Sequence, residues 1–182
     1  MKKMFLALVA ALTLTLTTTH AADFDKGYNA FNAGDYAAAL VEFSELAEQG
    51  DAGAQFNLGL MYSNGIGVTQ DYAAAVRWFR LAAEQGVTDA QFNLGFIYSN
   101  GVGVAQDYAA AVKWYGKAAE QGYASAQLNL AVMYFSDTGT PRDYIEAARW
   151  YHKAAEQDET AAHFALGVMY EHGAGVTQDY VQ

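Results

Sequence analysis

Two neighbouring stretches of the chain have nearly the same sequence and decide its fold. Residues 51–86 read DAGAQFNLGLMYSNGIGVTQDYAAAVRWFRLAAEQG, and residues 87–122 read VTDAQFNLGFIYSNGVGVAQDYAAAVKWYGKAAEQG. The dipeptide Asp-Tyr recurs five times at a spacing of 36 residues, at Asp35-Tyr36, Asp71-Tyr72, Asp107-Tyr108, Asp143-Tyr144 and Asp179-Tyr180. A period of this length indicates stacked pairs of helices that bury their apolar faces only against one another.

Each unit carries the signals of two helices joined by a loop. In the first helix, Ala54, Leu58 and Met61 recur at spacings of three and four, which places them on one apolar stripe. Closely spaced glycines within residues 63–68 break this pattern and predict a loop. Asp71 is expected to cap the second helix, and a glycine at the end of the unit is expected to stop it. The sequence therefore predicts an all-α chain.

The order of these signals closely resembles the Sel1-like repeat, a relative of the tetratricopeptide repeat with a longer loop between its helices. The matching pattern runs Ala-x-x-x-Leu-Gly-x-x-Tyr, Gly-x-Gly-Val, Asp-Tyr-x-x-Ala-x-x-Trp-Tyr/Phe and Ala-Ala-Glu-Gln-Gly. The resemblance implies a right-handed α-solenoid of stacked helix-turn-helix repeats. It divides the chain into a tetratricopeptide-like capping repeat at 22–50, Sel1-like repeats at 51–86, 87–122 and 123–158, and an incomplete repeat at 159–182.

The third repeat departs from this pattern in its loop. Asp137 stands where the first loop glycine is found in the other repeats, and Thr140 and Pro141 replace a Val-Thr pair. We expect this loop to be stiffer and less well anchored than the others. Asp143 and Glu146 have the spacing of a capping box, which the other repeats lack.

The fourth repeat has a first helix and a loop but no second helix. Leu166, Met169 and Tyr170 are therefore expected to lack the partner that covers them in the other repeats, and the end of a solenoid normally needs a polar cap. Two interpretations follow: the chain is a truncated product, or this surface pairs with another molecule.

Residues 1–21 have the three-part layout of a secretory signal peptide. Lys2 and Lys3 precede an apolar run from Met4 to Leu16, and cleavage is expected after Ala21. A membrane-spanning helix is the alternative, but it needs about 20 apolar residues and this run is shorter. Cleavage would remove two lysines and no acids, so the net charge would go from −10 to −12. We expect a periplasmic or secreted protein without stable membrane insertion.

Composition excludes several classes of function. Twenty Asp and Glu against ten Lys and Arg give a formal net charge of −10, the wrong sign for binding the phosphates of nucleic acids. The chain has no cysteine, so disulfides, thiolate metal sites and a cysteine nucleophile are excluded.

Catalytic and cofactor-binding motifs are also missing from the sequence. His152, His163 and His172 lack the spacing and acidic neighbours of a zinc-binding helix. The paired glycines join two helices rather than a strand and a helix, so we interpret them as turns and not as phosphate loops. No Ser is followed three residues later by Lys, and no Lys-Thr-Gly occurs. We therefore predict no enzymatic activity, no metal and no cofactor.

Binding by such an array is expected on the concave face, which the first helices line. By analogy with tetratricopeptide geometry, the residues two before and two after the central leucine of each first helix point to that face. They form an apolar ladder of Phe56, Leu60, Phe92, Phe96, Leu128, Val132, Phe164 and Val168. One hypothesis is a groove for an apolar or aromatic peptide segment; the alternative is that these side chains pack helix against helix.

Polar residues offer weaker signals. Repeated glutamines at Gln55, Gln91 and Gln127 are interpreted as bonding neighbouring segments. The densest acidic patch, which begins at Glu42 and ends at Asp51, is interpreted as a solvated helix face.

The sequence thus predicts an exported, non-enzymatic adaptor that binds a protein or peptide of unknown identity. Two alternatives stay open: a β-lactamase-associated or cell-wall-fragment-binding protein of the Sel1-like kind, and a structural protein that self-associates through its incomplete last repeat.

Overall fold

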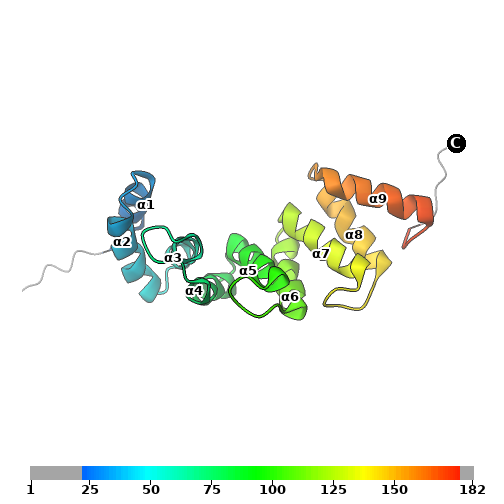
Figure 1. Cartoon of the computed structure of the whole chain (residues 1–182). Helices are drawn as coiled ribbons and strands as arrows, with labels where there is room; N and C mark the ends of the chain where they lie inside the picture. The colour runs from blue at the N-terminus through cyan, green and yellow to red at the C-terminus, as the bar shows by residue number, and fades with distance from the viewer. Residues whose placement is uncertain (1–21, 177–182) are drawn as a thin grey trace, which may run out of the picture.

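The computed structural model describes residues 22–176, and this part of the chain forms nine α-helices and no β-strand. The helices stack in chain order into an elongated α-solenoid, with α1 at one end and α9 at the other (Figure 1). Each helix packs chiefly against the helices before and after it. The helices are α1 (Phe24–Asn32), α2 (Tyr36–Glu48), α3 (Ala52–Asn64), α4 (Tyr72–Glu84), α5 (Thr88–Asn100), α6 (Tyr108–Glu120), α7 (Ala124–Ser136), α8 (Tyr144–Ala155) and α9 (Thr160–His172). The all-α solenoid predicted from the repeat is confirmed.

Two sequence-based predictions fall outside the described residues. These are the signal peptide at residues 1–21 and the last Asp-Tyr pair, at Asp179. Within residues 22–176, none of the helices has the length and apolar composition needed to cross a bilayer.

The predicted caps begin and end the helices. The carboxylate of Asp107 accepts the backbone N–H of Ala110 at 2.9 Å, and Asp71 does the same for Ala74 at 3.0 Å. At the end of α5, Gly101 takes the left-handed conformation with φ +66°. Asp137 takes the same conformation after α7, with φ +60°, because a short polar side chain tolerates this region better than most residues do.

Close packing within each unit depends on a small residue in the first helix. A Cβ atom added to Gly95 would lie 2.5 Å from Cδ1 of Tyr115, so only glycine lets that ring of α6 rest against α5. Gly59 stands in the same relation to Phe79, at 2.4 Å. The rings are almost fully buried as a result, with 3% of Tyr115 and 1% of Phe79 exposed.

Glutamine side chains connect one unit to the next. Gln91 donates its side-chain N–H to the carbonyl of Ala83 at 3.0 Å, and its own oxygen accepts from Gln121 at 2.7 Å. Gln121 also donates to the carbonyl of Gly86 at 3.2 Å. The same three bonds are made around Gln55 and around Gln127. The structural interpretation of the repeated glutamines is confirmed.

The loop of the third repeat keeps the backbone closure of the other loops, so the expectation of weaker anchoring is met only in part. Among the described residues it lacks one side-chain bond, which in the second repeat runs from Gln106 to the carbonyl of Ser99 at 2.7 Å. The backbone N–H of Asp143 donates to the carbonyl of Tyr134 at 3.0 Å, as Asp107 does to Tyr98 at 2.9 Å. Asp137 adds a bond of its own, since its carboxylate accepts the N–H of Arg142 at 3.0 Å.

The predicted capping box is only half formed. Asp143 accepts the N–H of Glu146 at 3.0 Å, but its own N–H is already bonded to the carbonyl of Tyr134 in α7. The Glu146 carboxylate instead pairs with Arg149, with a shortest contact of 2.6 Å.

Two further expectations were wrong. Leu166 and Met169 are buried against α8, with 6% and 1% exposed, so they do not lack a partner. In the acidic patch, Glu42 is only 5% exposed and forms an ion pair with Lys26 of α1, so this residue is not part of a solvated face.

Candidate functional site

The predicted apolar ladder divides into two sets in the structure. Phe56, Phe92 and Leu128 are half-buried and pack against the core clusters. The ring of Phe92 lies 5.7 Å from that of Tyr115 in its own unit and 4.9 Å from that of Tyr123 at the start of the next. Phe92 therefore bridges two adjacent units.

The second set is accessible only in part. Phe96 is 48% exposed and Val132 is 45% exposed, whereas Leu60 and Val168 are half-buried like the first set. Phe96 and Leu60 line one pocket of about 200 Å³ between α3 and α5. The structure therefore brings these two predicted residues together at one surface.

Phe164 differs from its counterparts in the other repeats. It is 76% exposed on α9, and no aromatic ring among residues 22–176 stacks on it. Its counterpart Phe92 is covered on one side by Tyr123 of the following unit.

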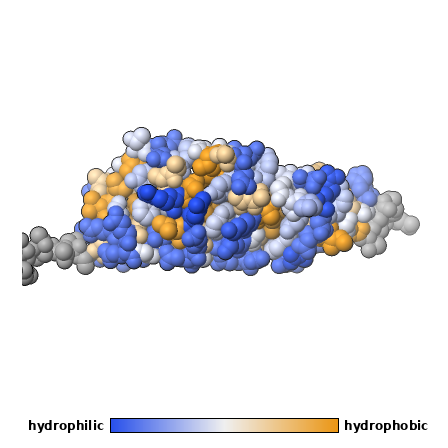
Figure 2. Space-filling model, turned by 90° about the horizontal axis from the view of Figure 1, so that it is seen from below, coloured by the Kyte–Doolittle hydropathy of each residue, from blue (hydrophilic) through white to orange (hydrophobic). Residues whose placement is uncertain are grey.

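On the face seen in Figure 2, apolar patches alternate with hydrophilic side chains along the described chain and do not gather in one large area. Such a surface suits several local contacts better than one large buried interface.

The titratable side chains of the described residues do not form a reactive cluster. His152 shares a hydrogen bond of 3.1 Å with the hydroxyl of Tyr170, and residues 22–176 contain no group of three His, Asp or Glu that could hold a metal ion. Burial raises the pKa of the Tyr115 and Tyr151 phenols above the ordinary value of 10.0. Ser99 shares a hydrogen bond of 3.3 Å with the hydroxyl of Tyr115.

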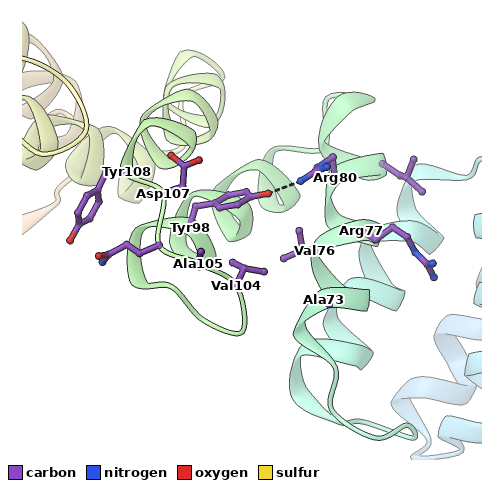
Figure 3. Close-up of a pocket in the computed structure, with 11 residues that line it drawn as sticks. Ala73, Val76, Arg77, Arg80, Tyr98, Val104, Ala105, Asp107 and Tyr108 are labelled. Atoms are coloured by element: carbon purple, nitrogen blue, oxygen red, sulfur yellow. Dashed lines mark hydrogen bonds between the residues drawn. The ribbon is translucent and has the colours of Figure 1, made fainter.

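Sequence analysis missed a larger pocket between α4 and the loop that joins α5 to α6. Its volume is about 810 Å³. Arg80 of α4 donates to the hydroxyl of Tyr98 on α5 at 2.6 Å across this pocket, with Val76 and Val104 nearby (Figure 3). A signal was present: Tyr recurs at positions 62, 98, 134 and 170, while Arg80 is replaced by Gly116 and His152 at the next two intervals of 36.

Comparison with known proteins agrees with the stacked pairs of helices seen in the structure. The model of the Sel1 repeat matches residues 52–87, 88–123, 124–159 and 160–182, which is most of the chain. The chain belongs to the Sel1 repeat family. Sel1 repeat proteins are generally scaffolds for protein interaction and are typically not catalytic. No curated protein matches the chain significantly.

Solved structures give the same result. A protective antigen present in uropathogenic Escherichia coli strains, with an SLR fold, is 45% identical with a TM-score of 0.81 over 85% of this chain and 34% of its own. A Sel1 repeat protein from Oxalobacter formigenes is 36% identical, also with a TM-score of 0.81, over 86% of this chain and 65% of its own. The Helicobacter pylori cysteine-rich protein B shares the fold at 19% identity and a TM-score of 0.53, over 68% of this chain and 94% of its own. This Sel1 repeat chain thus spans about a third of the first structure and just under two thirds of the second.

Proposed function

We propose that the chain is a non-enzymatic adaptor of the cell envelope that binds an apolar segment of a partner protein on the first helices of its repeats. The observation that carries this proposal is the exposure of Phe96 and Val132 at equivalent positions of consecutive repeats. An apolar side chain that is half exposed contributes little to folding, but it contributes to affinity when a partner covers it. The pocket beside Phe96 offers a place for one apolar side chain of that partner.

Export is the second part of the proposal and rests on residues 1–21. Their charged start, apolar run and small residue at the end are those of a signal peptide. The similarity to a protective antigen supports this part, since a protective antigen has to be accessible to the immune system. Cell fractionation followed by amino-terminal sequencing tests it: a chain that begins at Ala22 in the envelope fraction is expected, and an intact chain in the cytoplasm would refute export.

The interaction is tested by affinity capture from envelope extract with three forms of the chain. The test variant replaces the two exposed residues of the first helices, Phe96→Ser with Val132→Ser. The matched control replaces two exposed apolar residues of second helices, Val41→Ser with Ile145→Ser, which are 58% and 69% exposed. We expect a protein that the parent and the control retain and the test variant loses. If all three forms capture the same proteins, the surface around Phe96 is not the binding site.

Self-association through α9 is a further part of the proposal, because Phe164 is the most exposed of the large apolar residues described. Sedimentation velocity would show a mass that rises with concentration for the parent and stays monomeric for Phe164→Ser. A parent that is monomeric at all concentrations would contradict it.

A further inference from the structure

The pocket between α4 and the loop after α5 combines one cationic group with an apolar wall. Val76 is 7% exposed, Val104 is half-buried, and Leu81 and Tyr108 at the margin are 40% and 39% exposed. The Arg80 guanidinium lies at the edge of this wall and points toward Tyr98 (Figure 3). A ligand that fits here needs an apolar part and an anionic part.

The guanidinium of Arg80 has hydrogen-bonding capacity left over. Its contact with Tyr98 joins one nitrogen to the phenol oxygen, whereas the group carries five N–H donors. Neither of the ion pairs formed within residues 22–176 involves Arg80; they join Lys26 to Glu42 and Arg149 to Glu146. Arg80 has thus no carboxylate partner among the described residues, although the chain carries twice as many acids as bases.

The other charged groups of the pocket do not supply that partner. The carboxylate of Asp107 is used as the cap of α6, where it accepts the N–H of Ala110 at 2.9 Å. Arg77 adds positive charge, with its guanidinium 5.2 Å from the ring centre of Trp78, and in Figure 3 it points away from Tyr98. The local excess of positive charge in an acidic molecule favours an anionic ligand.

We propose that this pocket binds a peptide segment in which a carboxylate lies next to an apolar side chain. The carboxylate bonds the free N–H groups of Arg80, whose planar fork matches two carboxylate oxygens, and the Tyr98 hydroxyl fixes the guanidinium in place. The apolar side chain lies against Val76 and Val104. The carboxylate belongs either to an Asp or Glu or to the end of a chain, because both present the same two oxygens.

The site is specific to one repeat. The phenol of Tyr98 recurs at Tyr62, Tyr134 and Tyr170, but the guanidinium is replaced by Ser44, Gly116 and His152 respectively. His152 keeps a bond of 3.1 Å to Tyr170, without the two-pronged donor that a carboxylate prefers. Carboxylate binding is therefore expected at Arg80 alone within this row of pockets.

This pocket is separate from the surface of the proposed function. Phe96 and Tyr98 are two positions apart on α5, which places them about 200° apart around the helix. A partner on the Phe96 surface therefore leaves Arg80 accessible, and a failure of one proposal leaves the other standing.

Three short peptides and the whole chain test the proposal by NMR titration. The first is acetyl-Gly-Leu-Glu-Leu-Gly-amide, with an internal carboxylate; the second is acetyl-Gly-Leu-Gln-Leu with a free carboxyl end; the third is acetyl-Gly-Leu-Gln-Leu-Gly-amide, with none. We expect saturable shifts of the Arg80 side-chain signal and of the backbone amides of Val104 and Ala105 with at least one of the first two. The third should bind about tenfold more weakly or worse, because charge-assisted hydrogen bonds are the strong ones. Which of the first two binds identifies the source of the carboxylate.

Two variants give the controls. Arg80→Gln keeps a good helix former on the exposed side of α4 and should weaken the carboxylate peptide about tenfold, back to the level of the neutral one. Lys113→Gln removes the same charge one repeat away, at the counterpart of Arg77, and should leave binding unchanged. The proposal is overturned if no carboxylate peptide shifts these signals at millimolar concentration, if Arg80→Gln binds as well as the parent, or if Lys113→Gln weakens binding equally.

Discussion

The glutamine bonds between repeats make a quantitative prediction about what stabilises the array. Gln121 follows the end of α6 and donates to the Gln91 side-chain oxygen of its own unit at 2.7 Å and to the Gly86 carbonyl of the preceding unit at 3.2 Å. It also accepts from the hydroxyl of Thr88 at 3.0 Å. Replacing Gln121 with Ala removes all three bonds and leaves the backbone cap of α6 in place.

Most of the expected loss of stability comes from Gln91, the buried partner of Gln121. Gln91 is 3% exposed, so its side-chain oxygen would be left without its Gln121 partner and with little access to water. An unsatisfied buried acceptor costs about 1–3 kcal/mol. Gln121 is exposed and Thr88 is half-buried, so water can replace most of the hydrogen bonding that their other contacts lose. We expect Gln121→Ala to lower the free energy of unfolding by about 2 kcal/mol.

Urea unfolding followed by circular dichroism measures this value, and the chain contains its own control. Gln49 occupies the same place in the first unit, but among the residues that the structure describes its side chain makes no hydrogen bond. Gln49→Ala should therefore change stability by less than about 0.5 kcal/mol. Pairing Gln121→Ala with Gln91→Met in a double-mutant cycle should give a coupling of about 1 kcal/mol or more. If the Gln49 and Gln121 variants unfold alike, these bonds do not hold the repeats together.

Three further sets of substitutions test individual contacts through their effect on stability. Gly103→Ala should lower the free energy of unfolding by about 1 kcal/mol or more beyond the loss caused by Gly122→Ala, as measured by urea unfolding. Both glycines have positive φ, but only at position 103 would an added Cβ clash, at 2.1 Å from Cβ of Tyr72. Equal unfolding midpoints of the two variants would contradict the clash. Phe92→Ala should lower the free energy of unfolding by about 3 kcal/mol and Phe164→Ala by less than about 0.5 kcal/mol, because Phe92 packs between the rings of Tyr115 and Tyr123 whereas Phe164 is 76% exposed. A large loss of stability for Phe164→Ala would show that a partner or another segment covers this side chain. Burial raises the pKa of Tyr151 above its ordinary value of 10.0, so above pH 10 the folded chain keeps a proton that the unfolded chain loses. The free energy of unfolding should therefore hold below pH 10 and fall above it, and it should fall less steeply in Tyr151→Phe. Identical pH profiles of the unfolding midpoint for the parent and the variant would refute this.

The sequence predicted the helices and their caps because those features depend on neighbours in the chain. Asp107 caps α6 through a residue three positions away, and Gly101 ends α5 through its own backbone conformation. The capping box at Asp143 failed for the opposite reason. Its N–H is occupied by the carbonyl of Tyr134, a bond across the whole loop that a four-residue motif cannot reveal.

The candidate site was harder to predict, because exposure on a first helix depends on the next repeat. Phe92 and Phe96 are four residues apart and equally apolar, yet Tyr123 of the following unit covers the first and leaves the second 48% exposed. Glu42, which the acidic pattern places on a solvated face, is instead buried and paired with Lys26 on α1. Predicting the first case needs a contact between units, and predicting the second needs a contact between the two helices of one unit.

In a repeat array, the positions that do not repeat carry the most information about binding. The glutamine bonds and the loop closures recur from unit to unit because every interface has the same packing to satisfy. No such requirement explains Arg80, since its counterpart Gly116 occupies the same place in a unit with the same helices and loop. An arginine that packing does not need, beside a pocket that packing does not fill, is better explained by a ligand than by folding. The same reasoning explains why Phe96 stands out beside the smaller Leu60 and Val132, so the second repeat and its border with the first are where partners are expected to bind.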